Sequence, residues 1–70
     1  MKLKREFILN WIESKNWTFV KFCSRAGVSL CDFRKMMGYV KCDNVEDLIV
    51  LNINKLAKVV GVNICDLFEN

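Results

Sequence analysis

Residues 19–38, reading FVKFCSRAGVSLCDFRKMMG, decide the fold expected for this chain. Phe22, Cys23 and Ala26 are spaced so that they share one face of a helix. Phe33 and Met36 share a face in the same way further along. Between the two segments lies AGVS, whose glycine permits a sharp reversal of the backbone and can close a helix. The stretch therefore predicts two short helices joined by a tight turn.

Polar residues mark where each of these helices begins. Thr18 precedes the first and Ser29 precedes the second, and both are residue types that cap helix N-termini. We expect helices over about residues 19–25 and from residue 30 to 37 or 38, with the motif covering about residues 18–38. Two helices joined in this way form a helix-turn-helix, a motif that places its second helix in the DNA major groove.

The same stretch resembles the helix-turn-helix domain of the phage lambda repressor and Cro family, also called the XRE family. In that family the fifth position of the motif is usually alanine, because the two helices nearly touch there. Counted from Phe19, the fifth position here is Cys23, a small and easily buried substitute. Residues 51–68, LNINKLAKVVGVNICDLF, resemble the family's closing helix, Gly-Val turn and short helix. The resemblance covers about residues 17–68 and implies an all-α domain of five helices.

The first of the five helices is expected over about residues 4–15. Phe7, Ile8, Trp11 and Ile12 recur at helical spacing and predict a single apolar stripe that faces the core. Trp17 follows this helix, where the resembled family has an apolar residue that joins it to the next helix, and we expect this side chain to be in the core.

Residues 39–51 allow two interpretations. Apolar residues keep helical spacing from residue 45 onward, which would give one long helix over 44–60, and Asp43 and Glu46 have the spacing of a capping box at its start. However, DLIVL at 47–51 contains β-branched residues that favour extended structure, and Asn52 could cap a shorter helix ending at residue 60. The family resemblance favours the shorter helix, which we predict.

The end of the chain carries its own turn and cap. Gly61 is expected to close the preceding helix and Asn63 to cap a last helix over about residues 64–68. Ile64, Leu67 and Phe68 are then expected to fold back onto the core.

Composition predicts one folded domain over residues 1–70. The chain is 53% apolar and 27% charged, values that argue against disorder, and no apolar run is long enough to span a membrane.

The four cysteines lack the CxxC spacing of zinc sites, and there is no histidine. An even number of cysteines could form disulfides, but three of them lie in expected helices and no export signal precedes them. We interpret them as reduced thiols of a cytoplasmic protein.

The residue types give almost no support to an enzyme. Histidine, the commonest general base, is absent, and no Gly-rich phosphate loop occurs. We therefore expect no catalytic residues, no metal, no cofactor and no small-molecule ligand.

Charge is unevenly distributed along the chain. Residues 1–41 carry nine basic and three acidic residues, whereas residues 42–70 carry two basic and five acidic ones. The expected motif lies in the basic part, as a polyanion-binding surface requires.

The candidate DNA contacts follow from the second helix of the motif and from the resemblance. If Phe33 and Met36 face inward, the opposite side of the helix is free to approach DNA, and the residues that project from it are Leu30, Cys31, Arg34 and Lys35. Lysine suits guanine edges, leucine and cysteine can pack on thymine methyl groups, and serine and arginine suit phosphates. The candidate DNA-binding residues are Ser29, Leu30, Cys31, Arg34, Lys35 and Lys41.

The sequence thus favours a sequence-specific DNA-binding transcriptional regulator of the lambda repressor type, acting on double-stranded DNA as a homodimer. Apolar residues in 47–51 exceed what a surface loop needs, and we place the dimer interface there. The alternative is a protein-interaction module of the same fold, antitoxin-like or anti-repressor, that has lost DNA binding. Phe19, Leu30 and Cys31 favour this alternative, because they stand where the family usually has polar residues.

Overall fold

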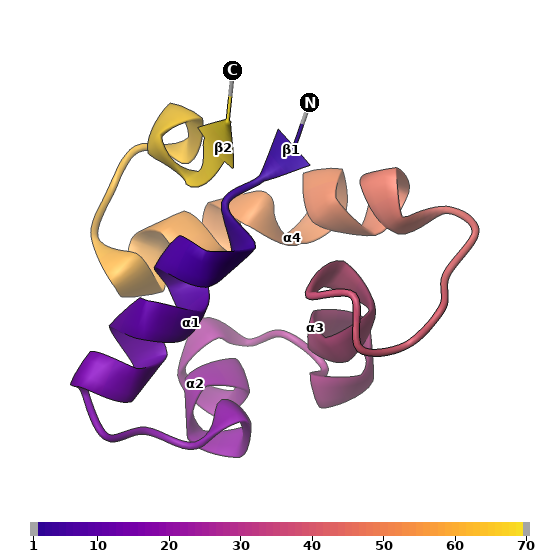
Figure 1. Ribbon diagram of the computed structural model, residues 1–70. Coiled ribbons are helices and arrows are strands. Elements are labelled where there is room, and N and C mark those ends of the chain that lie inside the picture. Colours follow the sequence, from indigo (N-terminus) through magenta and orange to yellow (C-terminus); the bar gives the residue numbers. More distant parts are fainter. Residues whose placement is uncertain (1, 70) are drawn as a thin grey trace.

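The computed structural model describes residues 2–69, which are mostly helical. In chain order the elements are β1 (Lys2–Leu3), α1 (Arg5–Ser14), α2 (Phe19–Ala26), α3 (Leu30–Met36), α4 (Val45–Val60), the 3₁₀ helix η1 (Ile64–Leu67) and β2 (Phe68–Glu69). Figure 1 shows α4 running across the middle, with α2 and α3 on one side of it and the strands on the other. The prediction of a helical fold is confirmed, and within residues 2–69 no helix is long and apolar enough to cross a bilayer.

The longest helix differs from the prediction. α4 spans sixteen residues, so the shorter helix capped by Asn52 is wrong and the longer alternative is correct. Asn52 lies inside the helix, 7% exposed, and its Nδ2 donates a hydrogen bond to the carbonyl oxygen of Leu48 at 2.8 Å. Ile49 and Ile53 are buried on the same face. Burial of this face outweighs the extended preference of residues 47–51.

The start of α4 also differs from the prediction. Asn44 is the residue before the helix, and its side chain makes no capping hydrogen bond. The capping box expected from Asp43 and Glu46 is therefore wrong. Glu46 and Asp47 still lie in the first turn, where their charges favour the positive end of the helix dipole.

The last helix, η1, is a 3₁₀ helix that ends at Leu67, one residue before the predicted end. Asn63 caps it as expected, and the Asn63 backbone N–H donates a hydrogen bond to Oδ2 of the Asp66 carboxylate at 3.3 Å. Of the residues expected to fold back, Leu67 is fully buried and Phe68 packs partly against the core, but Ile64 is 39% exposed.

A two-stranded antiparallel sheet, absent from the prediction, joins the two ends of the described chain. Leu3 pairs with Phe68 and Lys2 with Glu69, and the Lys4 backbone N–H donates to the carbonyl oxygen of Leu67 at 2.7 Å. Leu3 is buried in the core as a result. The sheet therefore fixes the chain that leads into α1.

One core holds all the helices together. Its buried apolar residues are Leu3, Ile8, Ile12, Phe22, Cys23, Val28, Phe33, Met36, Met37, Ile49, Ile53, Leu56, Ala57 and Leu67. The Phe22 and Phe33 rings, from α2 and α3, have centroids 5.4 Å apart, and Phe19 lies 5.3 Å from Phe33. Trp17 is half-buried and packs against this core, as predicted.

Candidate nucleic-acid interface

The α2 helix begins and ends where its sequence signals indicate. Thr18 has an extended backbone, and its Oγ1 accepts a hydrogen bond from the Lys21 backbone N–H at 3.1 Å. At the other end Gly27 adopts the left-handed conformation, with φ 75° and ψ 30°, and its N–H donates to the Cys23 carbonyl oxygen. A side chain at this φ would be strained, so glycine is required here. Both predictions, the Thr18 cap and the glycine turn, are confirmed.

The turn passes directly into α3. Val28 is buried and anchors the turn to the core. Ser29 is extended, and its Oγ accepts from the Asp32 backbone N–H at 3.5 Å, so this residue caps α3 as predicted. Because a hydroxyl group carries one donor beside its acceptor sites, the Ser29 O–H remains free to donate to a phosphate. The α2–α3 pair thus has the local geometry of two short helices joined by a tight turn.

A lysine of α4 fastens this turn to the rest of the molecule. Lys55 Nζ donates to the Gly27 carbonyl oxygen at 3.4 Å. That carbonyl belongs to the C-terminal end of α2, where a positive charge is favourable. α4 also packs against both α2 and α3. The orientation of the two motif helices is therefore held by α4.

Cys23 lies on α2 at the position where the resemblance predicts a close approach of α2 and α3. It is 3% exposed, and burial raises the pKa of its thiol, while the positive charge of Arg34 acts in the opposite direction. The thiol therefore stays protonated at neutral pH and behaves as a small apolar side chain. All four cysteines are free.

The outward side of α3 carries most of the residues predicted to face DNA. Ser29, Cys31 and Arg34 are exposed, and Lys35 is partly exposed. Leu30 differs, because it is half-buried and packs against the core. We predicted that Leu30 projects away from the core. Only the accessible part of its side chain does so, and the rest packs against the core.

Lys41 lies outside α3 on the segment that leads to α4. It is exposed, and it follows the backbone reversal at Gly38, which has a φ of 84°. The folded chain therefore separates the six predicted residues into a group at α3, from Ser29 to Lys35, and one lysine beyond its C-terminal end.

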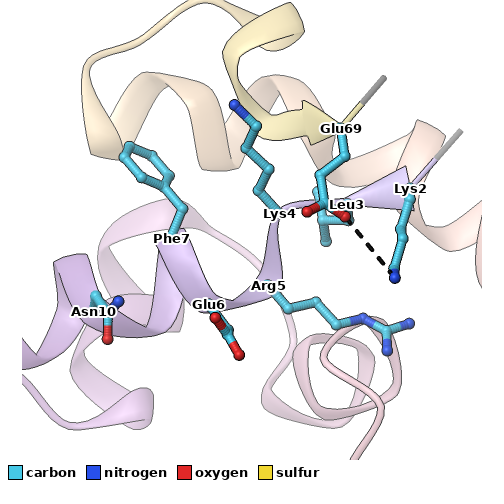
Figure 2. A pocket seen from close by; sticks show the side chains of 8 residues that line it. All are labelled: Lys2, Leu3, Lys4, Arg5, Glu6, Phe7, Asn10 and Glu69. Atoms are coloured by element: carbon cyan, nitrogen blue, oxygen red, sulfur yellow. Dashed lines mark ion pairs between the residues drawn. The ribbon is translucent and has the colours of Figure 1, made fainter.

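Arg5 is a further cation beside α3 that sequence reasoning missed. Its Nη1 atom lies 2.9 Å from the point that a Cβ atom on Gly38 would occupy. The guanidinium group is thus next to the last turn of α3, where backbone carbonyl groups favour a positive charge. Figure 2 shows Arg5 extending away from α1, whereas Glu6 and Phe7 point elsewhere. Arg5 and Gly38 are far apart in the sequence, so helical spacing gives no signal for this contact.

The segment around Arg5 also borders a surface hollow. The hollow has a volume of about 610 Å³ and is lined by residues of both charges. Lys2 and Glu69 form an ion pair at 4.0 Å across the strands, and both are well exposed (Figure 2). Such exposed pairs contribute little to stability. The described residues contain no group of three or more potential metal ligands, here or elsewhere.

Comparison of the chain with models of known protein families, with curated proteins and with solved structures found no match in any of the three.

Proposed function

We propose that the chain is a sequence-specific DNA-binding transcriptional regulator of the lambda repressor and Cro type, with α3 as the helix that enters the major groove. On this proposal the domain has that family's five-helix arrangement, η1 taking the place of the fifth helix. It acts in the cytoplasm as a homodimer on double-stranded DNA, without catalysis and without a cofactor.

One observation carries the proposal. Two capped short helices meet at a left-handed glycine, and the second of them leaves its basic side accessible. A helix in this position fits the width of the major groove, and side chains on its outer face reach base edges. Arg34 and Lys35 lie on that helix, and Arg5 adds a positive charge at its C-terminal end.

The residues divide into two roles. Lys35 is proposed to read a base edge, because lysine donates to guanine O6 and N7. Leu30 and Cys31 are proposed to contact thymine methyl groups with the surface they leave accessible. Ser29, Arg34 and Lys41 are proposed to hold phosphates, contacts that position α3 without reading sequence. The two roles predict different effects of mutation.

The experiment compares Lys35→Ala with Lys41→Ala. Lys35→Ala is expected to lose about 1–3 kcal/mol on the preferred site and to relax specificity at one base pair. Lys41→Ala is expected to weaken binding to all sequences alike. It also makes the slope of log affinity against log salt shallower by about one unit. The measurement is the affinity of each protein for selected and random duplexes across a salt series.

Lys15→Ala is the matched control. It removes the same charge from an exposed lysine outside the predicted set, one whose Nζ lies over the Trp11 ring, and binding is expected to change little. All three positions are at least partly exposed, so folding is expected to be retained in each variant. If the unmodified protein binds no duplex better than about micromolar at low salt, the proposed DNA binding is wrong.

A protein-interaction module is the second candidate. Cys31 is exposed at the start of α3, and Leu30 beside it keeps part of its apolar surface accessible. Asp32, half-buried in the same turn, adds a negative charge that repels phosphate. These three residues favour a protein partner. Failure of DNA binding at low salt would make this tip of α3 the surface to test against proteins.

A further inference from the structure

The outer side of α4 carries an exposed stripe at the spacing of a helix-pairing seam. Asp47, Leu51, Asn54 and Lys58 follow one another at intervals of three or four residues, and Val50 lies three residues after Asp47, so the five share one face. All five are exposed, and Leu51 is 73% and Val50 60% exposed. Single exposed apolar residues are ordinary on protein surfaces, but two together at the centre of such a stripe indicate a contact surface.

The ends of the stripe carry opposite charges. Asp47 lies in the first turn of α4 and Lys58 in its last turn. The helix dipole favours each charge at its own end. Across residues 2–69 the ion pair within 4.0 Å is Lys2 with Glu69, so neither Asp47 nor Lys58 has an oppositely charged partner there. An acidic end, an apolar centre and a basic end make the stripe complementary to its own reversed copy.

We propose that α4 pairs with α4 of a second copy of this chain, antiparallel and related by a two-fold axis. In that arrangement Asp47 of each copy faces Lys58 of the other, and Leu51 of each faces Asn54 of the other. Both ion pairs form together, because the same residue spacing, about 16 Å along the axis, separates the two charges in each copy. A two-fold interface requires this kind of self-complementary surface.

A small hollow beside the stripe fits the side chain that this pairing brings to it. The hollow has a volume of about 150 Å³, and its lining comprises Glu46, Asp47, Ile49, Val50 and Phe68. Two carboxylates and three apolar side chains match a lysine, whose stem is apolar and whose head is charged. In the antiparallel register the residue opposite Asp47 is Lys58 of the second copy. The hollow thus supports the same occupant as the charges do.

The size of the contact predicts a weak dimer. A sixteen-residue helix is about 24 Å long, and one pair of such helices lies at the low end of the areas that stable interfaces bury. Self-association is therefore expected to depend on protein concentration. The role of this dimer rests on the proposed function, because the dimer would place two recognition helices on one DNA molecule. The self-association itself is measured without DNA.

The experiment is sedimentation equilibrium of the full chain at concentrations up to about 1 mM. Leu51→Asp is expected to abolish the dimer, because it places charge at the centre of the seam. Val20→Asp is its control, since Val20 is 62% exposed on α2 and the same substitution there is expected to leave association unchanged. Circular dichroism establishes that each variant is folded.

Charge reversal tests the orientation. Asp47→Lys and Lys58→Asp each replace two attractions by two repulsions and are expected to raise the dissociation constant by about tenfold or more. The double variant restores both pairs and is expected to return to within about threefold of the unmodified protein. It also combines two changes that oppose the helix dipole, so its recovery could not come from a more stable α4.

Three results would overturn the inference. They are a protein that stays monomeric at every concentration, a dimer that survives Leu51→Asp, and a double variant that associates no better than the single ones. None of them bears on DNA affinity, which the duplex titrations measure separately.

Discussion

The α2–α3 pair and α4 form their helices for different reasons. α2 and α3 each begin at a side-chain cap, Thr18 and Ser29, and α2 ends at a left-handed glycine. α4 begins after Asn44 without a side-chain cap and continues through the β-branched residues around Val50. α4 ends, like α2, at a left-handed glycine, Gly61. Local hydrogen bonds therefore define where α2 and α3 begin, whereas α4 begins without a side-chain cap and is stabilised by burial of one face against the other helices. The difference can be tested by mutations that act on one region and spare the other.

The largest effect is expected from overfilling the buried site of Cys23, where α2 and α3 are predicted to cross. Cys23→Leu adds volume to a site that is 3% exposed, and it is expected to cost about 1–3 kcal/mol. Cys23→Ala, which keeps the site small, is expected to be nearly neutral. The measurement is the free energy of unfolding in urea. Equal stability of the leucine variant and the unmodified protein would mean that α2 and α3 are not closely packed at this point.

An intermediate effect is expected at the helix starts. Thr18→Ala removes a capping bond of 3.1 Å and is expected to cost about 1 kcal/mol. Asn44→Ala removes no such bond and is expected to change stability by less than about 0.5 kcal/mol. The measurement is the thermal unfolding of both variants under the same conditions, which compares the stability lost at the start of each helix. An equal loss in both would show that α4 depends on its first residue as α2 does.

The smallest effect is expected within α4. Val50→Ala replaces an exposed β-branched residue in the helix interior by the best helix former, and it is expected to stabilise the domain by about 0.5 kcal/mol. Urea unfolding at dilute protein concentration, where self-association is negligible, provides the measurement. A loss of stability would indicate that Val50 makes contacts within the monomer that outweigh its poor helix propensity.

The sequence was sufficient for the parts of the fold that are built from neighbouring residues. Thr18, Gly27 and Ser29 occupy the positions expected of them because caps and turns depend on a few consecutive residues. The α2 and α3 boundaries were accordingly predicted to within about two residues.

The remaining features depend on contacts between distant segments. The predicted start of α4 was wrong because the burial of Ile49 and Ile53 outweighed the preference of residues 47–51 for extended structure. The strand pair joins opposite ends of the chain, and two-residue strands carry no periodic pattern. At the candidate interface, helical spacing placed Arg34 and Lys35 correctly on α3. It could not place Arg5 beside Gly38, because packing between distant segments creates that contact.

The pairing of Leu3 with Phe68 has a consequence for the order of folding. Closing a loop of nearly the whole chain costs more entropy than forming a helix or the turn at Gly27, whose partners are close in sequence. The strands are therefore expected to form after the helices have met, and to separate before the helices do when the domain opens. When they do, Leu3 leaves the core and α1 loses its tether to Leu67, while α2, α3 and α4 keep their mutual contacts. Separation of the strands is thus expected to loosen the segment that carries Arg5 and holds it next to α3.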